Sequence, residues 1–121
     1  MKKRILIVED TEDNRAILRD LLTAHDFELI EAVDGEAGVA MAIKHKPDLI
    51  LMDIQLPILN GYEATRRIRA VPELRHVPII AITSYAMAGD AVRAVEAGCT
   101  GYVAKPFSPR AILARIREHI R

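Results

Sequence analysis

An uninterrupted apolar run at residues 49–52, Leu-Ile-Leu-Met, ends at a single aspartate, Asp53. Pro57 then stops regular structure, and Asn60-Gly61 reads as a turn. A continuous apolar run between turn signals is typical of a strand covered on both faces, as in a parallel sheet. Such a strand places Asp53 at its carboxyl end, the edge where open α/β sheets bind ligands. The other residues that reach this edge therefore decide the function.

Composition indicates one globular domain. The chain has 121 residues, 50% hydrophobic and 28% charged, which suits a single domain over residues 1–121. Lys+Arg and Asp+Glu both number 17, so no global field favours nucleic acid or an anionic membrane. The single cysteine, Cys99, excludes an internal disulfide. The apolar run at 5–8 is too short for a signal peptide or a membrane span, so we expect a cytoplasmic protein.

Strand and helix patterns alternate along the whole chain. The expected strands are residues 4–9, 27–32, 49–53, 77–83 and 101–105. Helices follow each of them, with 62–69 and 89–97 the third and fourth, Asp13 or Asn14 capping the first and Ser108 capping the last. This alternation predicts an α/β, doubly wound (βα)5 fold with a parallel five-stranded sheet. The second and fifth strands are the least apolar and belong at edges, which favours the flavodoxin-like order 2-1-3-4-5.

In this topology the strand ends bring polar side chains to one edge. The first strand ends in Glu9-Asp10, the third in Asp53, the fourth in Thr83 and the fifth in Lys105. Three neighbouring carboxylates do not all stay ionised without a counter-charge, and one lysine offsets only part of it. Mg²⁺, which prefers oxygen ligands, supplies the rest.

This set of side chains suits phosphoryl acceptance. A carboxylate acts as a nucleophile toward phosphorus and forms an aspartyl phosphate. Mg²⁺ and Lys105 would then stabilise the phosphoryl oxygens, and Thr83 would donate a hydrogen bond to one of them. Singly, each residue also has an ordinary explanation: Asp53 as a cap or loop residue, Glu9-Asp10 as an acidic helix start, and Lys105 as a surface charge. The combination is far more specific than any member.

These residues resemble the response-regulator receiver domain, the CheY-like family. The matching segments are Ile7-Val8-Glu9-Asp10, Leu51-Met52-Asp53-Ile54-Gln55-Leu56-Pro57, Asn60-Gly61, Ile82-Thr83, Gly98-Cys99 and Lys105-Pro106. The resemblance covers the whole chain, and these motifs are highly specific in this order and spacing. Residues 49–57 and 86–90 are most similar to single-domain cell-cycle regulators and to the receivers of hybrid histidine kinases.

The resemblance implies a role for each site residue. Asp53 accepts a phosphoryl group from the phosphohistidine of a histidine kinase or histidine phosphotransferase. Mg²⁺ is held by Asp53, by the backbone carbonyl of Gln55, and by Glu9 and Asp10, directly or through water. Thr83 and Lys105 contact the phosphoryl group.

The resemblance also implies a switch. Thr83 moves toward the phosphate and Tyr102 rotates inward, which changes the surface of the fourth helix, fifth strand and fifth helix for a downstream protein target. The Lys105-Pro106 bond is expected to be cis. Gln55 and Tyr85 occupy positions that influence how fast the phosphate is lost.

The resemblance implies a binding module that modifies itself, not an enzyme acting on an external substrate. A phosphatase of the haloacid-dehalogenase kind would need a second aspartate where Gln55 stands, and glutamine does not titrate. A flavodoxin-like electron carrier would need a Thr/Ser/Gly-rich phosphate loop, whereas residues 11–14 are acidic. We expect a stand-alone receiver, a monomer or weak dimer, with no direct contact to nucleic acid or membrane.

Overall fold

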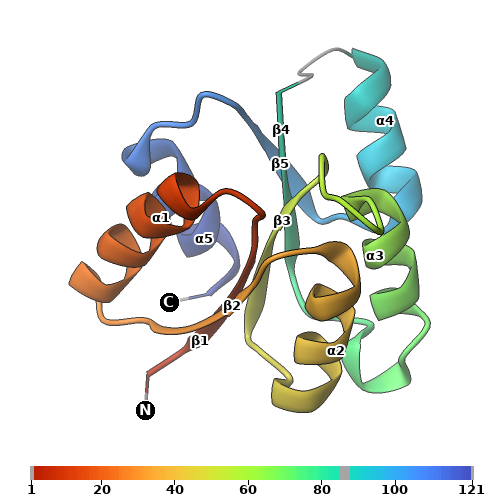
Figure 1. The fold of residues 1–121 in the computed structure, drawn as a ribbon, viewed down its shortest axis with the longest axis horizontal. Helices are drawn as coiled ribbons and strands as arrows, with labels where there is room; N and C mark the ends of the chain where they lie inside the picture. Colours follow the sequence, from red (N-terminus) through yellow and green to blue (C-terminus); the bar gives the residue numbers. More distant parts are fainter. Residues whose placement is uncertain (1, 85–87, 121) are drawn as a thin grey trace.

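Five strands alternate with five α-helices in the computed structural model, which describes residues 2–84 and 88–120 (Figure 1). The strands are β1 Arg4–Val8, β2 Glu28–Ala32, β3 Leu49–Asp53, β4 Ile79–Thr83 and β5 Gly101–Ala104. The helices are α1 Glu12–Ala24, α2 Gly35–His45, α3 Gly61–Arg69, the 3₁₀ turn η1 Pro72–Leu74, α4 Ala88–Ala97 and α5 Pro109–His119. None of the described helices has the length and apolar character needed to span a membrane.

The strands form one parallel sheet in the order β2-β1-β3-β4-β5, which confirms the predicted α/β (βα)5 fold. The two strands with the least apolar sequences lie at the edges, as expected. Every residue of β3 and β4 is buried, whereas β2 and β5 are mostly half-buried or exposed. Central strands lose both faces to packing helices, so their sequences are continuously apolar.

Two hydrophobic cores lie on opposite faces of the sheet, because successive strand residues point to opposite sides. On one face, Ile5, Ile7, Leu49, Leu51, Ile80 and Ile82 pack against Leu18 and Leu22 of α1 and Ile112 and Ile116 of α5. On the other face, Leu6, Val8, Ile50, Met52, Ile79 and Ala81 pack against Ala42, Ala64, Ile68, Ala94 and Ala97 of α2, α3 and α4. Figure 1 shows this division, with α1 and α5 on one face and the other three helices opposite.

The helix starts agree only in part with the sequence predictions. Ser108 caps α5 by accepting a hydrogen bond from the Ala111 amide at 3.0 Å, as predicted. The prediction that Asp13 or Asn14 caps α1 is wrong: Thr11 is the N-cap and its side chain makes no capping bond. The reason is that α1 starts four residues after the last residue of β1, at the carboxyl end of the sheet. Its first residues therefore make hydrogen bonds to Glu9 and not to the helix amides. Asn60, expected only in a turn, caps α3 through the Glu63 amide at 3.0 Å.

Two details of the segments after β4 and β5 bear on the site predictions. The Lys105-Pro106 peptide bond is cis, as the family resemblance implied. Tyr85, which the resemblance connected with phosphate lifetime, lies outside the described residues.

The loop between β3 and α3 passes very close to the start of α2. A Cβ atom built on Gly35 would lie 1.9 Å from the backbone carbonyl oxygen of Leu59. Because that neighbour is backbone, no side-chain rotation relieves the overlap. At Gly101, by contrast, an added Cβ meets nothing within 4 Å.

We therefore expect Gly35→Ala to lower the free energy of unfolding by about 3 kcal/mol or more, the upper end of overpacking costs. The matched change Gly101→Ala should alter it by less than about 0.5 kcal/mol, as for a substitution without contacts. Urea unfolding of both variants and the wild type measures the difference. Similar small effects at the two positions would contradict the close approach at Gly35.

The edge strand β2 is tied to α1 by ion pairs. The Nε and Nη2 nitrogens of Arg19 each donate a hydrogen bond to the Glu31 carboxylate at 2.8 Å. The hydrogen bonds from Arg19, with help from its charge, hold the pKa of Glu31 below its ordinary value. A carboxylate whose pKa is lower in the folded than in the unfolded protein stabilises the fold above the unfolded pKa, and that stabilisation is lost as pH falls through the folded pKa.

Glu31→Gln should accordingly lower the free energy of unfolding by about 1 kcal/mol at pH 7, the upper range for a partly exposed pair. The difference from wild type should shrink as the pH falls below the ordinary glutamate pKa and through the lowered pKa of the folded Glu31 carboxylate. Urea unfolding across this range tests it, with Glu96→Gln, at an exposed glutamate of α4, as the control. A difference that stays constant with pH would show that Glu31 stabilises by packing and not by charge.

Candidate functional site

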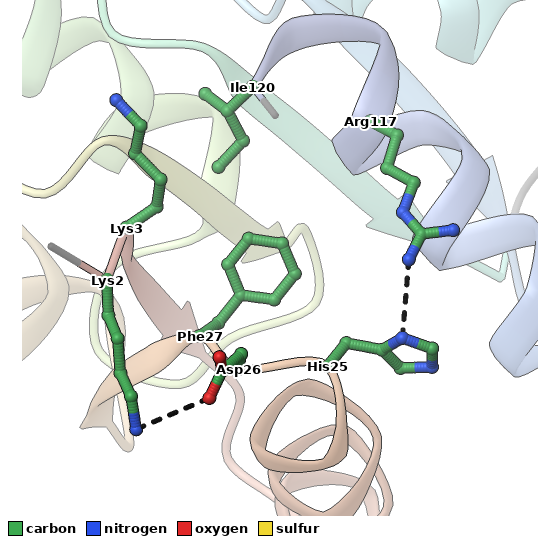
Figure 2. Close-up of a pocket in the computed structure, with 7 residues that line it drawn as sticks. All are labelled: Lys2, Lys3, His25, Asp26, Phe27, Arg117 and Ile120. Carbon is green, nitrogen blue, oxygen red and sulfur yellow. Dashed lines mark hydrogen bonds and ion pairs between the residues drawn. The ribbon is translucent and has the colours of Figure 1, made fainter.

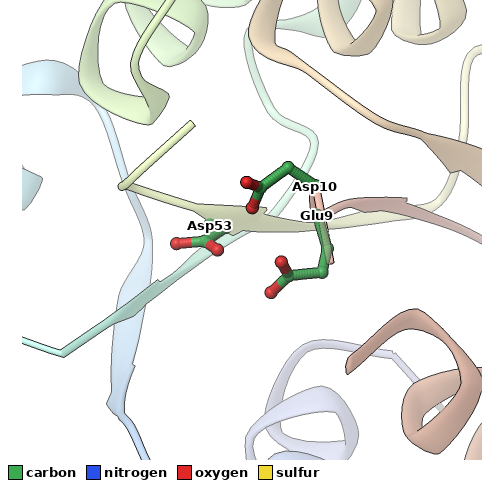
Figure 3. Close-up of side chains that lie close together, drawn as sticks. All are labelled: Glu9, Asp10 and Asp53. Carbon is green, nitrogen blue, oxygen red and sulfur yellow. The ribbon is translucent and has the colours of Figure 1, made fainter. Parts of the chain in front are cut away.

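Three carboxylates converge where β1 and β3 end. The register of the parallel pair places Val8 beside Met52, so Glu9 and Asp53 leave the sheet next to each other. Glu9, Asp10 and Asp53 each offer an oxygen, and these oxygens lie within 4.8 Å of one another. Figure 3 shows the three carboxylates grouped at the ends of the two strands. The predicted convergence at the switch point of the sheet is confirmed.

Asp53 is buried at the centre of this group, with 1% of its surface exposed. One carboxylate oxygen, Oδ2, accepts a hydrogen bond from the Lys105 ammonium at 2.7 Å. The other, Oδ1, accepts one from the backbone N–H of Gln55 at 3.0 Å. Lys105 is delivered from the end of β5, where its own amide donates to the Thr83 carbonyl at 2.7 Å. An ion pair between a partly buried ammonium and a buried carboxylate thus links the fifth strand to the third.

Glu9 is equally buried and is held by the first turn of α1. Its Oε2 accepts a hydrogen bond from the Thr11 amide at 2.9 Å, and its Oε1 lies 3.4 Å from both Asn14 Nδ2 and Lys105 Nζ. Burial raises the pKa of Glu9 from 4.5 to about 7; the Thr11 hydrogen bond lowers it, and the nearby Asp53 charge raises it. The site therefore resists holding both carboxylates ionised.

A single ammonium does not neutralise the group. Burial lowers the pKa of Lys105, but its hydrogen bond to Asp53 and the charges of Asp53 and Glu9 outweigh this, so its pKa is raised. Lys105 therefore stays cationic, but it pairs with only two of the three carboxylates, Asp53 at 2.7 Å and Glu9 at 3.4 Å, and its single charge does not balance the group. A hard divalent cation with oxygen ligands completes the balance, and the donors present are carboxylate oxygens of the kind Mg²⁺ prefers. Among the described residues, this is the one group of side chains arranged to hold a metal ion.

The remaining predicted site residues lie around this group at different depths. Thr83 ends β4 next to β3 and is buried, so it reaches the same edge. Gln55 is exposed in the loop after β3, where its Oε1 accepts a hydrogen bond from the Ser84 amide at 3.4 Å. Tyr102 is not part of the cluster: it is 36% exposed on the edge strand β5, beside a 460 Å³ pocket between β5 and α5.

Three residues at the start of α1, its N-cap and two residues of its first turn, contact Glu9 although these contacts were not predicted. They are Thr11, Asn14 and Arg15, and the last donates from Nη1 to the Glu9 carbonyl at 2.8 Å. Sequence patterns indicated a helix cap here, because short polar residues after a strand usually cap helices. Only their position directly after Asp10 hinted at a role in the site.

Two further pockets differ in chemistry. A 680 Å³ pocket with a mainly apolar lining adjoins Lys105 and is bounded by Asn14, Ile17, Ser84, Pro106, Phe107 and Pro109. A 460 Å³ pocket at the opposite edge of the sheet is lined by Lys2, Lys3, His25, Asp26, Phe27, Arg117 and Ile120 (Figure 2). Arg117 lies in the last turn of α5, where a cation stabilises the helix dipole, and Lys2 pairs with Asp26 at 3.6 Å.

Comparison with known proteins shows which family shares this arrangement. Residues 5–117 match the family model of the response regulator receiver domain. The polar-differentiation response regulator DivK of Brucella anthropi is 42% identical over 120 residues, which cover 99% of this chain and 98% of the relative.

Two solved structures share the fold closely. The receiver domain of the sensor histidine kinase PA1611 of Pseudomonas aeruginosa, with a magnesium ion coordinated in its active-site cleft, has a TM-score of 0.92, 38% identity and coverage of 99% of this chain and 98% of that one. The receiver domain of Ssk1, co-crystallised with the histidine phosphotransfer protein Ypd1 of Saccharomyces cerevisiae, has a TM-score of 0.91, 33% identity and coverage of 98% and 88%. The chain belongs to the response regulator receiver domain family of two-component signalling.

Proposed function

We propose that Asp53 accepts a phosphoryl group from a phosphohistidine in a Mg²⁺-dependent reaction. The observation that carries this proposal is the buried Asp53 carboxylate with the Lys105 ammonium 2.7 Å away and two further carboxylates beside it. An Asp53 oxygen forms the new O–P bond as the N–P bond of the phosphohistidine breaks. The electron pair of that bond returns to the imidazole nitrogen, which leaves as the donor's neutral or protonated histidine.

The chain's own residues divide the work. Glu9, Asp10, Asp53 and the Gln55 carbonyl would hold Mg²⁺, which supplies positive charge to the phosphoryl oxygens when bound. Lys105 supplies a second, fixed cation from the other side of Asp53. Thr83 donates its hydroxyl hydrogen to a phosphoryl oxygen. Burial of the group strengthens these interactions, because water does not screen them.

We further propose that the phosphorylated state changes the surface of α4, β5 and α5 for a downstream protein. Thr83 at the end of β4 and Tyr102 on the neighbouring β5 are the switch residues. Support comes from the pairing of these strands, which places Thr83 beside Ala104 and Ala81 beside Tyr102. The exposed position of Tyr102 leaves it free to move inward. The protein is then a switch that binds partners and has no external substrate.

The phosphodonor is a histidine kinase or histidine phosphotransferase, and we propose that it docks on the apolar pocket beside Lys105. Ile17 on α1 lines that pocket and is 48% exposed, so it offers a partner an apolar side chain at the mouth of an apolar pocket. A donor helix seated there would bring its phosphohistidine to Asp53. The co-crystal of the Ssk1 receiver with Ypd1 supports a donor of this class.

The rest of the proposal concerns the whole chain. Residues 1–121 act as one receiver domain, since one sheet with two cores spans the described residues. The large exposed apolar side chains are spread over several elements, which favours a monomer or weak dimer. A balanced charge and a single buried thiol, Cys99, favour a cytoplasmic location without binding to nucleic acid.

Intact-mass spectrometry after incubation with acetyl phosphate tests the reaction. The wild type should gain one phosphoryl group only when Mg²⁺ is present, and Asp53→Asn should gain none, because the amide is not a nucleophile of comparable strength. Asp34→Asn, which removes a helix-capping carboxylate away from the site, is the matched control and should still be labelled. Full labelling of Asp53→Asn would remove Asp53 from its role.

The docking proposal has its own test. Ile17→Glu should slow phosphotransfer at least about tenfold from a phosphorylated histidine protein that labels the wild type, since a charge would be buried against the donor. Labelling by acetyl phosphate should stay unchanged. Ile43→Glu, an equally exposed isoleucine on α2, is the matched control and should transfer at the wild-type rate. Equal rates for both variants would place the donor elsewhere.

A further inference from the structure

The first turn of α1 breaks an ordinary rule of helix starts. Arg15 lies in this turn, although a cation near a helix amino terminus is opposed by the helix dipole. Its side chain is only 12% exposed, so the charge is also taken largely out of water. A local conflict of this kind is usually retained for a function, and the contacts of Arg15 indicate which one.

Arg15 holds the backbone that carries the metal-binding carboxylates. Its Nη1 donates to the carbonyl oxygen of Glu9 at 2.8 Å, while the Glu9 amide donates to the Ala32 carbonyl at 3.0 Å. The Glu9 residue is therefore fixed from both sides, by β2 and by Arg15. The Glu9 carbonyl belongs to the peptide unit that leads into Asp10, so its orientation sets the direction of the Asp10 side chain.

Asp10 depends on this backbone more than its neighbours do. Glu9 and Asp53 are each held through their carboxylates, by the Thr11 amide and by Lys105 respectively. Asp10 is exposed, and within the described part of the chain its carboxylate has no hydrogen bond or ion pair. Only the peptide that Arg15 holds is left to orient it.

Arg15 is itself fixed by a ring of charges. Its Nη2 pairs with Glu12, and its Nε lies 3.5 Å from Glu31. Arg19 completes the ring through Glu31 at 2.8 Å and Glu12 at 3.3 Å, but within the described part of the chain it makes no hydrogen bond or ion pair with Glu9. The negative charges of Glu12 and Glu31 offset the unfavourable interaction of Arg15 with the helix dipole. The remaining nitrogen, Nη1, donates to the Glu9 carbonyl.

We propose that Arg15 is a positioning residue for Mg²⁺, which orients Glu9 and Asp10 before the ion arrives. This inference rests on the proposed function, since it concerns the same metal site. Mg²⁺ demands a nearly ideal octahedral arrangement, so its affinity is sensitive to small displacements of its ligands. Residues that orient metal ligands typically change affinity 10- to 100-fold when removed.

The sign of the effect separates positioning from simple charge. Arg15 is a cation close to a bound dication, so charge alone predicts that Arg15→Met tightens Mg²⁺ binding. Positioning predicts the opposite, a loss of about tenfold or more. Arg15→Lys keeps the charge but not the planar fork of donors, so we expect it to recover part of the loss.

Isothermal titration of the metal-free protein with MgCl₂ at constant ionic strength measures this. Arg19→Met is the matched control: it removes the same charge from the same ring but no contact with Glu9, and should bind Mg²⁺ within about twofold of wild type. Thermal unfolding without Mg²⁺ compares the stability of the two variants. Arg15→Lys keeps the test decisive if Arg15→Met fails to fold. An ammonium cannot reproduce the three separate contacts of the guanidinium, so this variant should still bind Mg²⁺ more weakly than wild type.

Wild-type or tighter affinity in the Arg15 variants, or an equal loss in Arg19→Met, would overturn the positioning role. If the wild type itself binds no Mg²⁺, the proposed function fails first. The two failures are therefore distinguishable in one set of titrations.

Discussion

The site depends most on one partly buried interaction, the ion pair of the Lys105 ammonium with the buried Asp53 carboxylate at 2.7 Å. Taking two charges out of water costs several kcal/mol per ion, and their attraction recovers it only with good geometry and further hydrogen bonds. Both conditions are met here. The backbone N–H of Gln55 donates to the second carboxylate oxygen of Asp53, and Lys105 also pairs with Glu9. Three carboxylates against one ammonium still leave an excess of negative charge. That excess makes the edge of the sheet a site for a dication and a phosphoryl group and not a closed ion pair.

The fold produces this imbalance. Parallel pairing of β1 with β3 sets Glu9 and Asp53 side by side, and β4 and β5 then bring Thr83 and Lys105 to the same edge. The two cores on either face fix the strands, so backbone geometry brings these polar groups to the edge. The contacts of Lys105 with Asp53 and of Thr11 with Glu9 then hold the carboxylates there. The start of α1 adds further support. The backbone N–H of Thr11, the N-cap residue, donates to the Glu9 carboxylate, and the Thr11 side chain makes no capping bond.

The sequence was sufficient for what depends on strand ends and apolar continuity. The unbroken run before Asp53 predicted a central strand, the weaker runs predicted edges, and the topology then predicted that Glu9, Asp10, Asp53 and Lys105 meet. It was insufficient where a side chain has two possible partners close in sequence. Asn14 suits a cap by type, yet its amide turns toward Glu9, and Arg15 reads as a surface charge, yet it is nearly buried on the Glu9 carbonyl. Only the tertiary position of the buried Glu9 decides between these outcomes.

Carbon-detected NMR of the carboxyl groups during a Mg²⁺ titration tests the central claim most directly. The account predicts that the carboxyl carbons of Glu9, Asp10 and Asp53 shift together, with one common midpoint. Asp34 and Asp48, which are engaged in helix capping and in a hydrogen bond to the Arg4 amide, should not respond. Shifts that are spread evenly over the acidic residues, or an Asp53 signal that stays unmoved while Mg²⁺ binds, would contradict a metal site organised around Asp53.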